Sequence, residues 1–178
     1  NYKAKLNKWT FDVTAMLSDV KNNVTSLIEG LPFIDGGSVR TQPGQALGSF
    51  FGYKALGFFS DSNEIKNSPI QFGIPWNSNP TTGPKAGDMK YADISGPDGK
   101  PDGKVDVNDR TFLGNSFPRY EYSINLNVGY AGFDLNLFFQ GVGKRDNYLS
   151  GTGAQPFASA DFAASLLEIH KDYWTPTN

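Results

Sequence analysis

The sequence predicts an all-β fold, and three observations support that prediction. Three stretches alternate apolar and polar residues with a period of two, which is typical of strands with one apolar face. A two-residue turn separates two of them. Only one segment has the periodicity of a helix. Two architectures remain open at this point: a soluble β-sandwich, and a fragment of a large antiparallel transmembrane β-barrel with long extracellular loops and one short helix.

The first predicted strand runs from Lys8 to Ser18. Its apolar residues fall on alternate positions, and polar residues occupy most of the positions between them. The apolar set is Trp9, Phe11, Val13, Ala15 and Leu17. This stretch therefore predicts a strand with one apolar and one polar face.

The clearest strand pair lies between Tyr120 and Gly141. Tyr120 to Tyr130 and Phe133 to Gly141 both alternate, and only Ala131 and Gly132 separate them. We expect a tight antiparallel hairpin here. The aromatic and glycine-rich stretch from Ala46 to Phe59 alternates less well and predicts a strand with a bend or bulge. The segment from Asp161 to Trp174 is the predicted helix, with an apolar stripe suited to packing on a loop.

The residues on the strand faces and the lengths of the connections support a membrane barrel and a β-sandwich about equally. The polar faces carry mainly Asn, Ser, Asp, Gln and Gly, and aromatic residues lie near the strand ends, as at membrane interfaces. The strands have about the 9–11 residues that a tilted crossing needs. One turn is very short, whereas residues 21–45, 60–119 and 147–178 form long connections, an asymmetry typical of outer-membrane barrels.

Composition excludes several classes of function. The net charge of −2 comes without any cluster of Lys and Arg, which argues against a nucleic-acid partner. There is no cysteine, hence no disulfide or thiolate metal site, and no apolar run approaches the roughly 18 residues of a transmembrane helix. The single histidine, His170, allows no Ser/His/Asp or HExxH arrangement. No catalytic residue is predicted.

An acidic loop at residues 88–115 is the strongest candidate site. Calcium takes six to eight oxygen ligands, which an EF-hand-type loop supplies from positions 1, 3, 5, 7, 9 and 12 with glycine at position 6. Gly103 falls at position 6. The predicted ligands are Asp93, Ser95, Asp102, Lys104 through its backbone carbonyl, Asp106 and Asp109.

This assignment treats residues 97–101 as a five-residue insertion between positions 3 and 5. An ungapped count instead puts Asp98 at position 1 and Lys100 at position 3, where an ammonium group would oppose the cation. The gapped register is preferred, and it makes Asp98 an optional ligand or a solvated residue. A cluster of ordinary Gly/Pro/Asp turns is the remaining alternative. Short or extended flanks argue against the paired helices of a true EF-hand.

Several strings resemble the C-terminal part of the SusC/RagA family of TonB-dependent outer-membrane transporters. These are GDMKYADIS, DGKVDVNDRTFLGN and PRYEYSINLNVGYAGFDLNLFFQGVGKRD, preceded by WTFDVTAMLSDVKNNVTSL and GQALGSFFGYKALGFFSDSNEI. The resemblance covers nearly all of residues 1–178, and the insertion at 97–101 is one departure from it.

The resemblance implies a 22-stranded barrel in the Gram-negative outer membrane. It implies import of oligosaccharides or peptides together with a SusD-like surface lipoprotein, driven by the TonB complex. Residues 1–178 are then expected to be an incomplete C-terminal portion of the barrel, in contact with the rest of the barrel and with lipid. Calcium is the predicted structural cofactor. The alternative functions are a soluble calcium-dependent carbohydrate-binding β module and a surface glycoside hydrolase domain.

Overall fold

The computed structural model describes residues 1–71, 83–156 and 166–175. The chain divides into two compact units. Unit 1 comprises Asn1–Ser49 and Gly114–Asn147, and unit 2 comprises Phe50–Leu113 and Tyr148–Asn178. The described residues form β-sheets with a single short α-helix, so the predicted all-β class is confirmed.

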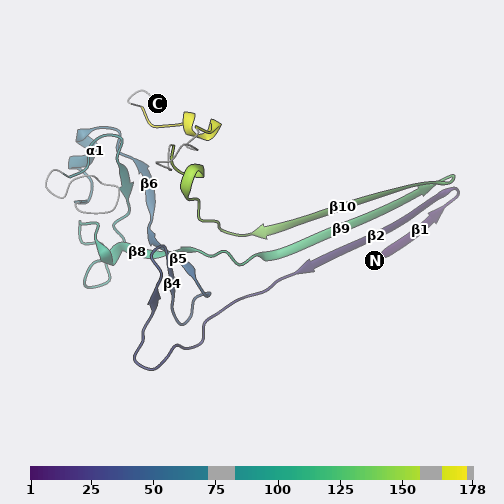
Figure 1. Ribbon diagram of the computed structural model, residues 1–178, viewed down its shortest axis with the longest axis horizontal. Helices are drawn as coiled ribbons and strands as arrows, with labels where there is room; N and C mark the ends of the chain where they lie inside the picture. The colour runs from purple at the N-terminus through teal and green to yellow at the C-terminus, as the bar shows by residue number, and fades with distance from the viewer. Residues whose placement is uncertain (72–82, 157–165, 176–178) are drawn as a thin grey trace. The chain divides into compact units, whose positions relative to one another are not determined.

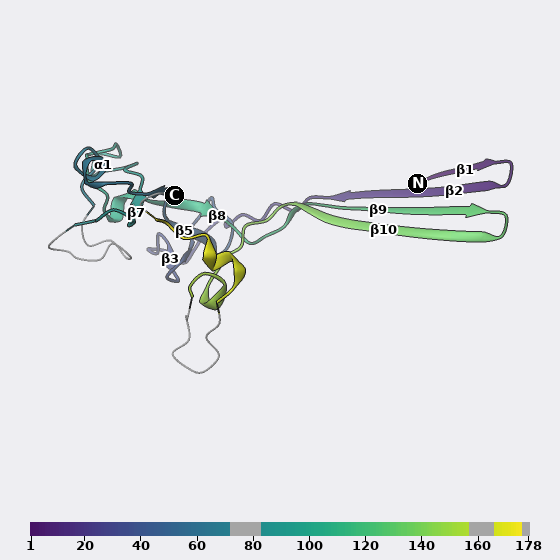
Figure 2. The same cartoon turned by 90° about the horizontal axis from the view of Figure 1, so that it is seen from above.

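Unit 1 is built on a four-stranded antiparallel sheet in the order β1-β2-β9-β10 (Figures 1 and 2). Its strands are β1 (Tyr2–Leu6), β2 (Trp9–Ser18), β9 (Arg119–Tyr130) and β10 (Phe133–Lys144). β9 joins two strands that are far apart in the sequence, because it pairs with β2 on one side and β10 on the other. Within the described residues this sheet does not close into a barrel. An open antiparallel sheet of this kind is consistent with a barrel fragment.

The predicted hairpin is confirmed in detail. Ala131 and Gly132 have φ angles of 48° and 91°, and positive φ at both central residues is the requirement of a type I′ turn. Phe133 pairs with Tyr130, and the register continues without a slip to Val142 opposite Glu121. The prediction missed β1, whose five residues are too short to establish a period, although Tyr2, Ala4 and Leu6 do alternate with two lysines.

Unit 1 also contains a small hairpin of β3 (Ile34–Asp35) and β4 (Val39–Thr41). The guanidinium of Arg40 donates two hydrogen bonds to the Asp35 carboxylate, of 2.7 and 2.8 Å. The same guanidinium lies 3.8 Å from the centre of the Phe33 ring. The ion pair and the cation–π contact together fix the orientation of this hairpin's side chains.

Unit 2 contains most of β5 (Ser49–Tyr53) and of β8 (Arg110–Gly114), together with β6 (Ala55–Phe58), α1 (Ser62–Lys66) and β7 (Met89–Tyr91). β5 and β6 confirm the interrupted strand predicted for residues 46–59, since they are separate strands and β6 pairs with β7 through a bulge between Ala55 and Gly57. Three 3-10 turns complete the elements: η1 (Val107–Asp109), η2 (Gly151–Gly153) and η3 (Glu168–Lys171).

The helix predicted from Asp161 to Trp174 is wrong over its described part. Residues 157–165 lie outside the described residues, and the remainder contains only the 3-10 turn η3. The apolar stripe predicted to pack is instead exposed at Leu166, Ile169 and Tyr173. A short helix is marginal without a packed face, which explains why the periodicity did not suffice. The short helix of the fold is α1, which Asp61 caps by accepting hydrogen bonds from the N–H groups of Asn63 and Glu64.

The buried apolar side chains of the described residues are Phe59, Tyr91 and Val105, all in unit 2. Tyr53 and Met89 pack against Tyr91 and Val105. The long sheet of unit 1 has no such core within the part of the chain described. No helix among the described residues combines the length and apolar character that crossing a bilayer requires.

Candidate functional site: a two-faced sheet and a closed acidic loop

The register of unit 1 aligns the apolar residues of four strands on one face of the sheet. Phe11 lies opposite Ala4 on one side and Val128 on the other, and Val128 lies opposite Leu135. The same alignment holds along the strands. The apolar face consists of Tyr2, Ala4, Leu6, Trp9, Phe11, Val13, Ala15, Leu17, Tyr122, Ile124, Leu126, Val128, Tyr130, Phe133, Leu135, Leu137, Phe139 and Gly141. Because a strand has a period of two, this face is continuous.

The apolar face is exposed. Phe133 is 79% exposed and Leu17 is 74% exposed, and most of its other large side chains are also exposed. Monomeric soluble proteins rarely expose an apolar surface that spans four strands. The face therefore requires a covering, either a second protein layer or lipid.

Aromatic residues mark both ends of this face. At the hairpin end the Trp9 and Tyr130 rings lie 4.3 Å apart. At the other end the Tyr122 ring lies over Gly141, where an added Cβ would come within 2.4 Å of the tyrosine hydroxyl. Gly141 thus leaves room for the ring on its neighbouring strand. Tyr and Trp at both ends of an apolar band are typical of membrane-spanning strands.

The opposite face is mainly polar and is internally hydrogen-bonded, although Met16, Phe138 and Val142 also lie on it. The Asn136 side-chain amide donates to the side-chain oxygens of Asn125, at 2.8 Å, and Asn127. The Lys3 ammonium lies 3.2 Å from the Asp12 carboxylate. The two faces of the sheet therefore suit two different surroundings.

In unit 2 the acidic loop closes on itself through two carboxylates. Asp93 accepts hydrogen bonds from the N–H groups of Asp102, at 3.3 Å, and Gly103, at 2.8 Å. Asp109 accepts from Ile94 at 2.7 Å and Ser95 at 3.0 Å. The loop's two halves, distant in sequence, are thereby held together at both ends.

Residues 97–101 form a separate turn, as the gapped register requires. The Gly96 N–H donates to the Lys100 carbonyl at 2.6 Å, and the Gly99 N–H donates to the Gly96 carbonyl at 2.9 Å. Asp98 accepts a hydrogen bond from the Lys100 N–H within this turn and is exposed. Asp93 therefore bridges the two halves of the loop, whereas Asp98 contacts only its own turn.

The remaining predicted ligands lie around this closure. Asp102 accepts a hydrogen bond from the Lys104 N–H at 3.0 Å, and Asp106 accepts one from Asn108 at 2.8 Å. Asp109 is fully buried and also accepts from the Asp106 N–H at 2.7 Å. Burial raises the pKa of Asp109, but the hydrogen bonds from Asp106, Ser95 and Ile94 outweigh it, so that the pKa lies below its ordinary value.

The six predicted ligands are thus neighbours in one loop, but their carboxylates chiefly accept backbone hydrogen bonds. Among the described residues, no three acidic or histidine side chains converge closely enough to form a metal cluster. The calcium prediction therefore stays a prediction. The flanks of the loop are β7 on one side and η1 and β8 on the other, so the paired helices of an EF-hand are not formed.

Val105 anchors the loop to the core of unit 2. It is 2% exposed and clusters with Tyr91. Its N–H donates to the Ile70 carbonyl, and the Ile70 N–H donates to the Gly103 carbonyl, both at 2.8 Å. Val105 therefore packs inward and pairs with a residue from a distant part of the chain.

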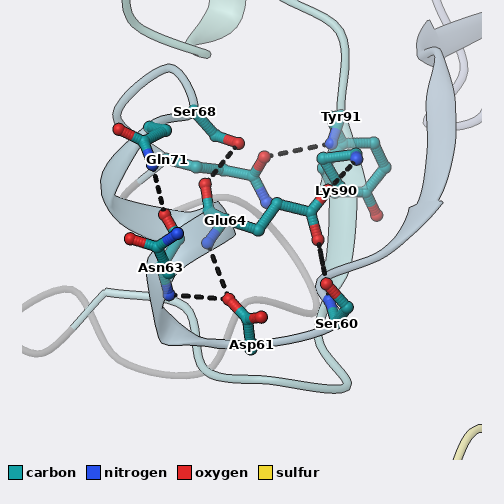
Figure 3. Close-up of polar contacts among 9 residues, drawn as sticks. Ser60, Asp61, Asn63, Glu64, Ser68, Gln71, Lys90 and Tyr91 are labelled. Atoms are coloured by element: carbon teal, nitrogen blue, oxygen red, sulfur yellow. Dashed lines mark hydrogen bonds and ion pairs between the residues drawn. The ribbon is translucent and has the colours of Figure 1, made fainter.

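Gln71, next to Ile70, holds β7 (Figure 3). Its side chain is 2% exposed; the amide donates to the Met89 carbonyl at 2.7 Å, and its oxygen accepts from the Tyr91 N–H at 3.0 Å. The dipeptide Ile70–Gln71 thus links the acidic loop to β7. No sequence pattern indicated this role, because a single Gln in a polar segment has no periodicity.

A second link joins α1 to β7. The Glu64 carboxylate accepts hydrogen bonds from the Lys90 ammonium and from the N–H and hydroxyl of Ser60 (Figure 3). The hydrogen bond from Lys90, followed by those from Ser60, lowers the pKa of Glu64 to about 2.

Sequence comparison gives one relative. The chain is 30% identical over 140 residues to TonB-dependent receptor P3 of Formosa agariphila, a match that covers 76% of this chain. The matched part spans only 12% of the length of that receptor. No family model matches the chain. The relative is named as a receptor and not as an enzyme, in agreement with the prediction that the chain carries no catalytic site.

Proposed function

We propose that this chain forms part of the wall of an outer-membrane transport barrel. The premise is that the chain belongs to the TonB-dependent receptors, which its sequence match supports. The observation that carries this proposal is the exposed apolar face that crosses four strands of unit 1. Lipid covers that face in the proposed protein, and the polar face lines the interior. Both outer strands of the sheet, β1 and β10, then pair with further strands of the same barrel.

The finer proposal is the SusC/RagA branch of these receptors. The motifs at residues 87–95, 102–115 and 118–146 support it. On this proposal the parent protein imports oligosaccharides or peptides, works with a SusD-like lipoprotein and draws energy from the TonB complex. These activities belong to the whole receptor.

A soluble carbohydrate-binding module is the competing function, and the two differ in what covers the apolar face. In a sandwich, a second sheet would bury Val13 and Leu126 away from any solvent. In a barrel, the same positions would face lipid.

Spin labelling of the full-length receptor in lipid vesicles separates these two outcomes. The described chain contains no native cysteine, which simplifies labelling here. Nitroxides at Val13 and Leu126 are expected to be accessible to oxygen, which concentrates in lipid. Nitroxides at Thr14 and Ser123, on the polar face, are the matched controls and should not share that accessibility. Labels at Val13 and Leu126 that are shielded from every collider would refute the barrel.

We further propose that the acidic loop takes Ca²⁺ as a structural ion. The donors are the carboxylates of Asp93, Asp102, Asp106 and Asp109, with the Ser95 hydroxyl and the Lys104 carbonyl, a set of hard oxygens that suits calcium. The support is the closure that brings Asp93 next to Gly103 and sets residues 97–101 aside as a turn. Calcium would add cross-links to a loop that hydrogen bonds already close.

Calorimetry on the full-length receptor tests the calcium proposal. Asp102→Asn and Asp106→Asn should weaken calcium binding and abolish the rise in Tm that calcium gives. Asp98→Asn makes the same charge change within the inserted turn and should leave both unchanged. A wild-type protein that binds no calcium, or whose Tm is indifferent to a chelator, would overturn the proposal.

A further inference from the structure

A small polar pocket lies in unit 1, at the end of the long strands opposite the turn between β9 and β10. Its lining includes Lys21 and Asn22 beyond β2, Asn115 in the connection before β9, Arg119 at the start of β9, Lys144 at the end of β10 and Asp146 just beyond it. The cavity is about 190 Å³. This is smaller than the roughly 300 Å³ of pockets that enclose whole drug-sized ligands, so it suits one chemical group of a larger molecule.

Hydrogen bonds within the chain already occupy acceptors around this pocket. The side-chain oxygen of Asn22 accepts from the Leu47 N–H at 2.9 Å, and that of Asn115 accepts from the Phe117 N–H at 3.1 Å. Asp146 accepts from the Asn115 N–H at 3.0 Å. Each of these asparagines also carries an amide NH₂ group that can donate to a ligand.

The charged residues of the pocket lining also suit an anionic ligand. The Arg119 guanidinium donates to the Asp19 carboxylate through two nitrogens, so the charge of Arg119 is already paired. Among the described residues, no carboxylate forms an ion pair with Lys21 or Lys144. The lining therefore contains two lysines for which the described residues form no ion pair, and a single acidic residue, Asp146.

We propose that this pocket binds an oxyanion, the carboxylate or sulfate group of an acidic cargo molecule, with Lys21 and Lys144 as the charged contacts. Charge-assisted hydrogen bonds from ammonium and amide donors are the chemistry that such a group requires. The proposal rests on the proposed function in one respect. Short turns of a barrel face the periplasm and longer loops face outward, so this end of the strands is the one that incoming cargo meets.

Binding to the purified full-length receptor in detergent tests the proposal. The probes are tri-galacturonate, tri-glutamate and uncharged maltotriose, titrated by calorimetry at low salt. We expect an acidic probe to bind and its affinity to fall as salt rises. The double variant Lys21→Gln/Lys144→Gln should lose at least tenfold in affinity, and Lys21→Arg/Lys144→Arg should retain most of it.

Lys8→Gln is the matched control, because Lys8 lies in the turn between β1 and β2, outside the pocket lining. It should bind as the wild type does. If only tri-galacturonate binds, the ligand is an acidic saccharide, and if only tri-glutamate binds, it is an acidic peptide. If both bind, the pocket recognises the oxyanion without further selection. Each of these three outcomes supports the proposal. Failure of both acidic probes to bind, or equal affinity in the double Gln variant, overturns it. The spin labels at Val13 and Leu126 test the barrel, whereas the calorimetry tests oxyanion binding. The barrel proposal and the oxyanion proposal can therefore fail independently.

Discussion

The Asp93 carboxylate accepts a 2.8 Å hydrogen bond from the backbone N–H of Gly103, which lies ten residues further along the chain. This contact bypasses the inserted turn at residues 97–101 and restores the spacing of a compact loop. The contact is a direct hydrogen bond within the chain, so the loop's closure and its proposed calcium binding can be tested separately.

The first prediction follows from that separation. Asp93→Ala removes the acceptor for the N–H groups of Asp102 and Gly103 and should destabilise the loop by about 1–3 kcal/mol, even in the presence of a chelator. Hydrogen exchange of residues 102–105 in the full-length receptor measures the effect. Asp98→Ala, in the inserted turn, should change exchange at these residues little. Equal protection in the two variants would mean that Asp93 does not hold the loop closed.

The second prediction concerns the apolar face of unit 1. Val13 lies in the middle row of that face, opposite Leu126, which in turn lies opposite Leu137. Val13→Arg should cost about 2–4 kcal/mol in lipid, because a guanidinium near the bilayer midplane loses its hydration. Thr14→Arg places the same side chain on the polar face and should cost much less. Urea unfolding of the receptor in vesicles compares them, and equal costs would contradict the assignment of the faces.

The third prediction concerns Gln71, whose buried side chain satisfies the Met89 carbonyl and the Tyr91 N–H. Gln71→Leu leaves both groups without this partner and should cost about 1–3 kcal/mol for each. Exchange should accelerate at Tyr91, and also at Val105, because the neighbouring Ile70 pairs with the acidic loop. Asn67→Ala removes an exposed side-chain hydrogen bond near the same segment and is the control. Faster exchange at Tyr91 alone would show that the two links are independent.

Sequence patterns predicted what depends on regular repetition. The long strands β2, β9 and β10 of unit 1 and the turn at Ala131 and Gly132 follow from local backbone preferences, and they were confirmed. The gapped register of the acidic loop stays a prediction, because the hydrogen bonds of Asp93 show the closure of the loop and not an ion.

Contacts between distant segments have no recognisable pattern in the sequence. The pairing of Ile70 with residues 103–105 depends on tertiary folding, and so does the bond between Glu64 and Lys90. The helix predicted from Asp161 to Trp174 was wrong over its described part, residues 166–174, for the converse reason. Its periodicity was present, but the described apolar side chains at Leu166 and Ile169 have little to pack against.

The fourth prediction is a pH dependence at Glu64. Its pKa is lowered to about 2 from the ordinary value of 4.5. A lowered carboxyl pKa stabilises the folded state fully above 4.5, and the contribution declines as the pH falls toward 2. Glu64→Gln should therefore destabilise the segment at neutral pH and remove this part of its acid sensitivity. Thermal unfolding at pH 7 and pH 3 measures both, with the exposed Glu29→Gln as control. A Glu64→Gln protein with unchanged acid sensitivity would contradict the assignment.

The fifth prediction uses two glycines with similar backbones and different surroundings. Gly87 and Gly99 have φ angles of 88° and 78°, so alanine is strained by a similar amount at each. An added Cβ at Gly87 would also lie 2.7 Å from the Trp174 ring, whereas nothing lies within 4 Å of one at Gly99. Gly87→Ala should therefore cost more than Gly99→Ala, and the excess measures the contact with Trp174.

Hydrogen exchange of residues 85–91 in the full-length receptor reports this difference. In a Trp174→Ala background, the cost of Gly87→Ala should fall to the strain that Gly99→Ala shows by itself, because the obstructing ring is gone. If the excess persists without the indole, it arises from the backbone at Gly87, and Trp174 does not pack on this turn.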